Sequence, residues 1–155
     1  MEVKGFEEIL ADHPVFRDFD ADILLLLAGC CMNEHFKPGE VIYGEGDGAD
    51  KVYILRHGDV AIEVGAPGRG QIIVETLHAG DILGWSWIVP PYRHRSEAHA
   101  TSEVRAVSID AACLRRKCDD NPVLGYRIFQ HWLPHMAQRV QVLRMQLLDL
   151  YGTRG

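Results

Sequence analysis

The sequence has few of the features that mark membrane, metal-binding or disulfide-rich proteins. Its 155 residues include four cysteines, and no two of them form a C-x-x-C pair. The spacing typical of zinc and iron–sulfur sites is therefore missing, and we expect reduced thiols in the cytoplasm. The N-terminus has no apolar signal core, and no apolar run is long enough to span a bilayer. These absences predict a cytoplasmic protein that does not enter a membrane.

Positive charge is scarce over the first two thirds of the chain. Residues 1–104 carry 8 lysines and arginines against 18 acidic residues, whereas residues 105–155 carry 8 against 4. General binding to nucleic acid needs clustered cations that displace counterions. The acidic majority of the chain therefore argues against direct DNA binding. We interpret the mildly basic last third as a solvated helix face.

Motifs of covalent and metal catalysis are also missing. The serines lack a G-x-S-x-G context, and the eight histidines include no H-x-H pair of the kind that cupin metal enzymes use. We therefore predict that the chain is not an enzyme and binds no metal, with a cupin-like metal enzyme as the least favoured alternative. The histidines weighed for a metal site are His57 and His78 beside His94 and His99, and the helical pair His131 and His135, which we expect to face solvent or a dimer seam.

Short β-branched runs fill the middle of the chain, from about residue 31 to residue 109. KVYILRH and VAIEV are joined at Gly58-Asp59, which is a hairpin signal. Val41–Tyr43, QIIVETL and EAHATSEVRAVSID supply further strands between glycine-rich or polar turns. Many short strands at such spacing indicate an antiparallel barrel or jelly roll.

Helical patterns flank the strands on both sides. GFEEILAD is amphipathic, and Asp20 is positioned to cap a second helix that ends near residue 28. Asp110 precedes AACLRRKC, and Asn121-Pro122 begins a helix that reaches about residue 151. Such a helix is roughly 45 Å long and commonly packs on a second copy of itself. Pro134 lies inside it, and we expect a kink there.

Four motifs stand in order within the strand region: PGEVI, EGDGAD, YILRHGDV and GDILG. With them, the chain resembles the cyclic nucleotide-binding domain of the catabolite-activator (Crp/Fnr-like) family over roughly residues 6–151. The resemblance implies a mainly β fold with helices (α+β): an eight-stranded antiparallel β-roll, or jelly roll, flanked by short N-terminal helices and a long C-terminal helix. It also implies turns at Gly39, Gly46, Gly58 and Gly80.

The resemblance covers nearly the whole chain, so we expect a single domain over residues 1–155. Its expected parts are N-terminal helices at 1–30, a β-roll at 31–109 with a phosphate cassette at 80–100, and C-terminal helices at 110–151. In the family's transcription factors a helix-turn-helix domain follows the long helix. The sequence ends shortly after that helix, which predicts a stand-alone domain.

The family's cassette binds a cyclic phosphate through backbone N–H groups and an arginine, and a glutamate after a glycine accepts a hydrogen bond from the ribose. Gly84 matches that glycine, but Trp85 stands at the glutamate position, and an indole only donates hydrogen bonds. Counting from the last strand places His94 at the arginine position, whereas a one-residue indel would place Arg95 there. Glu97 would repel a phosphate that it faced.

Three occupants of the expected pocket remain open. They are a cyclic nucleotide (cAMP or cGMP) in an altered mode, another small ligand stacked on Trp85 or Trp87, and the aromatic side chains themselves. Core filling is the commoner role of large aromatic residues. The candidate ligand-binding residues are Gly84, Trp85, Ser86, His94, Arg95, Ser96 and, on the C-terminal helix, Gln138.

The sequence thus predicts a regulatory or sensor domain that binds a small ligand, phosphate-bearing or not, and signals through its C-terminal helix to an unknown protein partner. Coupling requires only that the ligand prefer one arrangement of the helix. The alternative is a degenerate, ligand-free β-roll that acts as a dimerisation or protein-interaction module. On either interpretation we expect a homodimer formed through the C-terminal helix.

Overall fold

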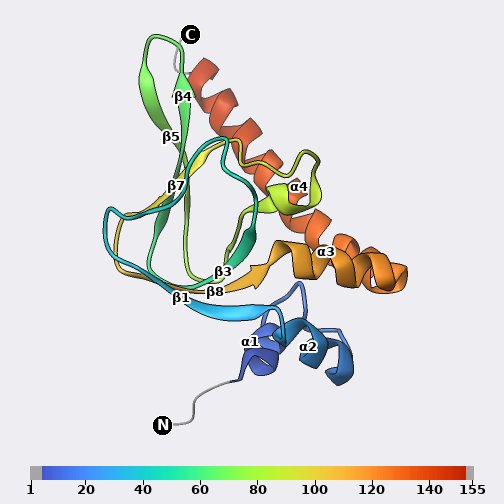
Figure 1. Cartoon of the computed structure of the whole chain (residues 1–155). Coiled ribbons are helices and arrows are strands. Elements are labelled where there is room, and N and C mark those ends of the chain that lie inside the picture. Colours follow the sequence, from blue (N-terminus) through green and yellow to red (C-terminus); the bar gives the residue numbers. More distant parts are fainter. Residues whose placement is uncertain (1–4, 153–155) are drawn as a thin grey trace. The chain divides into compact units, whose positions relative to one another are not determined.

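A computed structural model describes residues 5–152 of the chain, and Figure 1 shows the arrangement of its helices and strands. The predicted order of short helices, strands and a long last helix is confirmed. The elements are α1 (Phe6–Asp12), α2 (Ala21–Ala28), β1 (Cys31–Phe36), β2 (Val41–Tyr43), β3 (Lys51–His57), β4 (Val60–Ala66), β5 (Gly70–Leu77), β6 (Ile82–Leu83), the 3-10 helix η1 (Trp85–Ile88), β7 (Glu97–Ala100), β8 (Val104–Asp110), α3 (Ala111–Asp120) and α4 (Pro122–Gly152).

The strands form two antiparallel sheets of four strands each. Their strand orders are β1-β8-β3-β6 and β2-β7-β4-β5. Both sheets contribute to one hydrophobic cluster, which includes Leu55 and Val104 from the first sheet and Ile62 and Ala98 from the second. The eight-stranded antiparallel β-roll predicted from the sequence is therefore confirmed.

The chain forms two compact units. One comprises residues 25–116 and contains the β-roll, and the other combines the chain up to Leu24 with the chain from Lys117 onward. In the helical unit, the side-chain oxygen of Asn121 accepts a hydrogen bond from the N–H of Leu124 at 3.2 Å, as expected of a helix cap. Helix α4 then continues through Pro134 to Gly152. Within residues 5–152, no helix combines the length and the apolar character that a bilayer span needs.

The two histidines of α4 contact aromatic rings of the helical unit. The ring of His131 meets Phe19 edge-on at 5.9 Å between centroids, and the ring of His135 lies 6.3 Å from that of His13. Both were expected to face solvent or a dimer seam. His135 is exposed, as expected, whereas His131 is half-buried beside Phe19, and for His131 the expectation is wrong. Helical periodicity alone does not tell which neighbour a helix face meets.

Cys30 and Cys113 form a disulfide, whereas Cys31 and Cys118 are free. The expectation that all four thiols are reduced is therefore wrong. Strand β1 begins just after Cys30 and pairs with β8, which leads directly into α3, so the pairing brings the two cysteines together across 83 residues of sequence. Burial raises the pKa of the free Cys31 thiol to about 11, so this thiol is mostly protonated near neutral pH and little of it is present as the nucleophilic thiolate.

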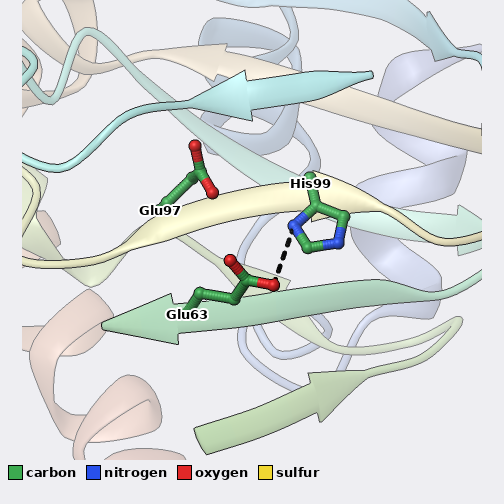
Figure 2. A group of neighbouring side chains, drawn as sticks. All are labelled: Glu63, Glu97 and His99. Atoms are coloured by element: carbon green, nitrogen blue, oxygen red, sulfur yellow. Dashed lines mark ion pairs between the residues drawn. The ribbon is translucent and has the colours of Figure 1, made fainter. Parts of the chain in front are cut away.

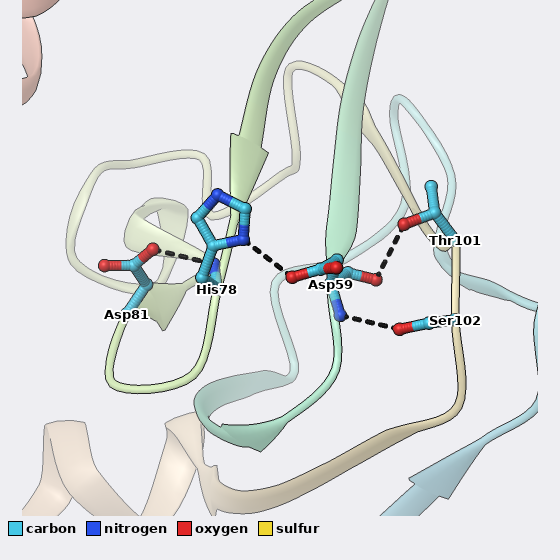
Figure 3. A network of polar contacts seen from close by, with 5 residues as sticks. All are labelled: Asp59, His78, Asp81, Thr101 and Ser102. Carbon is cyan, nitrogen blue, oxygen red and sulfur yellow. Dashed lines mark hydrogen bonds and ion pairs between the residues drawn. The ribbon is translucent and has the colours of Figure 1, made fainter.

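A polar network holds together three turns at one end of the β-roll (Figure 3). The N–H of Asp59 donates to the Ser102 hydroxyl at 3.0 Å, and the Thr101 hydroxyl donates to the Asp59 carbonyl at 3.2 Å. The imidazole of His78 lies 2.6 Å from the Asp59 carboxylate, which raises the pKa of His78. These contacts connect the β3–β4 and β7–β8 turns with the end of β5.

Candidate functional site

The segment after β6 carries the predicted cassette. Gly84 has φ +96°, a left-handed conformation that favours glycine, and it leads into η1. Trp87 is buried, with 1% of its surface exposed, so its predicted role in filling the core agrees with its position. The guanidinium of Arg115 donates to the Trp87 carbonyl at 2.8 Å and lies 4.3 Å from the centre of the Tyr92 ring. Arg115 of α3 therefore contacts the cassette at two points, Trp87 and Tyr92.

The glycine-rich loop before β3 pairs with the end of the cassette through three backbone hydrogen bonds. The N–H of Gly46 donates to the His94 carbonyl at 2.8 Å, and the N–H of His94 donates to the Asp47 carbonyl at 2.9 Å. The N–H of Ala49 donates to the Tyr92 carbonyl at 2.7 Å. This short ladder fixes the backbone of His94 and turns its side chain toward β2.

His94 is the buried centre of the site. Its imidazole is 5% exposed and stacks on the Tyr43 ring, with 3.5 Å between centroids and 9° between planes. The Cε1 atom of His94 lies 3.5 Å from the point where a Cβ on Gly84 would stand, so the two residues are in close contact. Burial lowers the pKa of His94, and the nearby Asp47 and Asp50 carboxylates act in the opposite direction. The ring is therefore mostly neutral at pH 7, unlike an arginine.

A cavity of about 430 Å³ opens beside this stack. Its chemistry is aromatic and acidic, with Lys51 as the one lysine or arginine among the lining residues that the structure describes. The Lys51 ammonium is already paired with the Glu34 carboxylate at 2.6 Å. A phosphate group would therefore meet more negative than positive charge. The lining residues are Ile42, Tyr43, Asp47, Gly48, Asp50, Lys51, Tyr53 and His94.

The structure brings together only part of the predicted ligand-binding set. Gly84 and His94 lie side by side, as described, whereas Arg95 is exposed and Ser96 is half-buried. The backbone therefore presents His94, and not Arg95, to the cavity, although the role of either residue stays a prediction.

The remaining predicted residues lie away from the lining. Trp85 is half-buried and Ser86 is buried in η1, and neither is among the residues that line the cavity. Gln138 is exposed on α4, in the helical unit. Glu97 is not among the lining residues either, so the repulsion that it would exert on a phosphate does not arise there.

Sequence reasoning missed Tyr43, Asp47 and Asp50 as lining residues. The signal was present in the glycine-rich segment GEGDGAD, whose two aspartates were expected only to lie in a loop. That loop lies more than 40 residues before His94, and only the ladder described above brings the two together.

Comparison with known proteins identifies relatives of this chain. A 29% identical relative over 147 residues is the "CRP-like cAMP-activated global transcriptional regulator" of Mycobacterium tuberculosis, and the match covers 95% of this chain and 64% of the relative. The chain thus spans less than two thirds of the length of that curated relative. A 25% identical relative, covered over 34% of its length, is a potassium channel protein of Rhodopseudomonas palustris.

Solved structures show the same architecture. A protein of Geobacter metallireducens GS-15, described as a cyclic nucleotide-binding protein, superposes with a TM-score of 0.79 at 27% identity, over 90% of this chain and 99% of that one. The regulatory domain of Toxoplasma gondii PKA in complex with cAMP superposes with a TM-score of 0.71 at 19% identity, over 86% of this chain and 49% of that one, and supports the fold alone. A family model described as "Cyclic nucleotide-binding domain" matches residues 33–121, which is more than half of the sequence. The β-roll and this match together establish that the chain belongs to the cyclic nucleotide-binding domain family.

Proposed function

We propose that this chain is a regulatory domain whose β-roll binds a small planar ligand beside His94 and signals through α4 to a protein partner. The observation that carries the proposal is the stack of His94 on Tyr43 at the edge of a cavity lined by Asp47 and Asp50. A neutral imidazole stands where the resemblance places the phosphate-binding arginine. The favoured ligand is therefore a nucleoside or a similar planar heterocycle without a phosphate.

Family membership supports the regulatory part of this proposal. The relatives are named as transcriptional regulators, a channel protein and a kinase regulatory subunit. The cAMP in the name of the Mycobacterium tuberculosis relative makes a cyclic nucleotide the natural competitor for the same cavity. Each ligand class makes its own demand: a cyclic phosphate needs a cation, whereas a nucleoside needs a ring surface and hydrogen-bond partners.

A thermal-shift experiment separates these ligands. Adenosine, guanosine, cAMP and cGMP are added to the protein at equal concentrations. A ligand present at 100 times its dissociation constant stabilises the folded state by about 2.7 kcal/mol, which for a chain of this size corresponds to a shift of roughly 5–10 °C. We expect the larger shift with a nucleoside. A larger shift with a cyclic nucleotide would contradict the ligand class, and no shift with any of them up to millimolar concentration would contradict binding.

Variants test whether the cavity beside His94 is the site. His94→Ala should abolish the ligand-induced shift because it removes the ring on which Tyr43 stacks at the edge of the cavity, whereas Arg95→Ala should retain it because Arg95 is exposed. Circular dichroism confirms that each variant is folded. Loss of the shift in Arg95→Ala with retention in His94→Ala would move the site to the neighbouring residue.

A second function, dimerisation through α4, is favoured by the C-terminal half of that helix. Val140, Leu143, Leu147 and Leu150 recur at the a and d spacing of a coiled coil and are 45%, 43%, 55% and 58% exposed. Apolar residues at this spacing pair with a second helix that has the same spacing, and we propose that this second helix is α4 of another copy of the chain. Leu143→Asp should give a monomer in analytical ultracentrifugation, and Gln141→Asp, on the same turns, should leave the dimer intact. A wild-type protein that is monomeric at micromolar concentration would contradict this role.

A further inference from the structure

Three side chains with metal-ligating atoms converge on one face of the β4–β7 pair (Figure 2). Glu63 comes from β4, and Glu97 and His99 come from β7. One ligating atom from each lies within 4.8 Å of the other two. Successive side chains along β7 point to opposite faces of the sheet. Ala98 and Ala100 belong to the hydrophobic core, so Glu97 and His99 point to the other face.

Glu63 and Glu97 stand directly opposite each other in the pairing of β4 with β7. Both are half-buried, and like charges in directly opposed positions are destabilising. Within residues 5–152, the Glu63 carboxylate has an ion pair with His99, and no hydrogen bond or ion pair engages the Glu97 carboxylate. Two opposed carboxylates beside one imidazole leave negative charge that a cation would neutralise.

The contact between His99 and Glu63 is too long for a hydrogen bond. The His99 Nδ1 lies 3.8 Å from the Glu63 Oε1, and the two side chains are 22% and 17% exposed. Hydrogen bonds of this type measure about 2.7–3.2 Å. Two ligands held about 2.0–2.2 Å from a tetrahedral metal ion stand roughly 3.4 Å apart. The observed separation is therefore closer to that of two ligands of one ion than to that of a directly bonded pair.

One imidazole nitrogen and two carboxylate oxygens form a ligand set with a defined preference. Imidazole suits zinc and other divalent first-row transition metals, and carboxylates bind these ions as well. Magnesium and calcium prefer ligand sets made of oxygen alone. Three protein ligands also leave a coordination position for water.

We propose that Glu63, Glu97 and His99 bind a divalent transition-metal ion of the zinc class on the face of the β4–β7 pair that points away from the hydrophobic core. The bound ion neutralises the opposed carboxylates and links the two strands. Because β7 begins at Glu97, shortly after His94, the ion also fixes the strand that follows the ligand cavity. This site is separate from the cavity beside His94 and does not depend on its function.

Titration of metal-free protein with ZnCl2 tests the site. Isothermal titration calorimetry should show one equivalent of Zn²⁺ bound, and MgCl2 should give no saturable binding. Glu97→Gln and His99→Gln should each weaken Zn²⁺ binding by about 10-fold or more, since even outer partners of metal ligands have effects of about that size. In metal-free protein Glu97→Gln should raise the melting temperature, because it removes the repulsion, and with Zn²⁺ the wild type should become the more stable of the two.

His78→Gln is the matched control. It removes a histidine that also lies beside a carboxylate, that of Asp59. Among the residues that the structure describes, this exposed pair is not part of a group of three metal-ligating side chains. Zn²⁺ affinity should be unchanged in this variant. The proposal is overturned if the wild type binds no Zn²⁺ up to millimolar concentration, if Glu97→Gln and His99→Gln bind like the wild type, or if His78→Gln loses as much affinity as they do. Circular dichroism establishes that each variant is folded, and Glu63→Gln is a further variant to use if one of them is not.

Discussion

Replacement of Gly58 by alanine should test the packing between two turns of the β-roll. Gly58 has φ +89°, and an added Cβ would stand 2.1 Å from the carbonyl oxygen of Glu103 and 3.0 Å from the Cα of Val104. Both contacts are with backbone, so no change of rotamer relieves them. Gly46 is the matched control, because its φ is +90° and an added Cβ would meet nothing within 4 Å.

The two substitutions share one cost and differ in another. A non-glycine residue in the left-handed region costs about 1–2 kcal/mol in either position. At Gly58 the β7–β8 turn must also move by more than 1 Å to reach ordinary van der Waals contact, and overpacking of this kind costs about 1–3 kcal/mol. The expected difference of about 2 kcal/mol corresponds to a melting temperature roughly 4–8 °C lower for Gly58→Ala than for Gly46→Ala.

Urea denaturation followed by circular dichroism measures both variants against the wild type. We expect a lower transition midpoint for Gly58→Ala and an unchanged slope, because the surface exposed on unfolding is the same. Equal losses of stability in the two variants would refute the close approach of the Gly58 turn to Glu103. A larger loss in Gly46→Ala would show that the glycine-rich loop before β3, and not the β3–β4 turn, is the sterically crowded one.

Three further predictions concern the disulfide, the surface histidine and the buried tryptophan. Cys113→Ser should lower the free energy of unfolding by as much as about 4.5 kcal/mol, the loop-closure value for cysteines this far apart in sequence. The variant should also no longer lose stability when dithiothreitol is added. Equal stability of the oxidised and reduced wild type would contradict the disulfide. The hydrogen bond to Asp59 raises the pKa of His78. The stability that His78 contributes should therefore be fully present below about pH 6.5 and decline as pH rises through its folded-state pKa. The melting temperature of the wild type minus that of His78→Gln should shrink as pH rises, and a difference that grows with pH would contradict this. Trp87→Ala should cost about 3–5 kcal/mol because the side chain is buried, clearly more than Trp85→Ala, and similar midpoints of the two variants in urea would be the contrary result.

Much of the fold follows from short-range signals in the sequence. Asn121-Pro122 marks the start of α4 because a side-chain cap and a proline at the first helical position act within one turn. The glycines predicted to mark turns, Gly39, Gly46, Gly58 and Gly80, all have positive φ, a conformation that residues with a Cβ rarely adopt. Such preferences act between near neighbours, so a single sequence reveals them.

The candidate site was only partly predictable. Gly84 and the ambiguity between His94 and Arg95 were visible, because the cassette is one continuous segment. The choice between the two residues was not, since it depends on the ladder that joins His94 to the loop containing Asp47. A shift of one residue along an extended segment reverses which side chain points inward.

What the sequence by itself determined is the order of elements, the turns and the family, all of which rest on local backbone preferences and on motifs in register along the chain. Tertiary structure alone decided which distant residues meet: Tyr43 with His94, Cys30 with Cys113, and Glu63 with Glu97. Each of these pairs joins segments that are tens of residues apart, and strand pairing within each of the two sheets sets the register of the segments. Pairing over such separations depends on the packing of the whole β-roll, which local preferences do not encode.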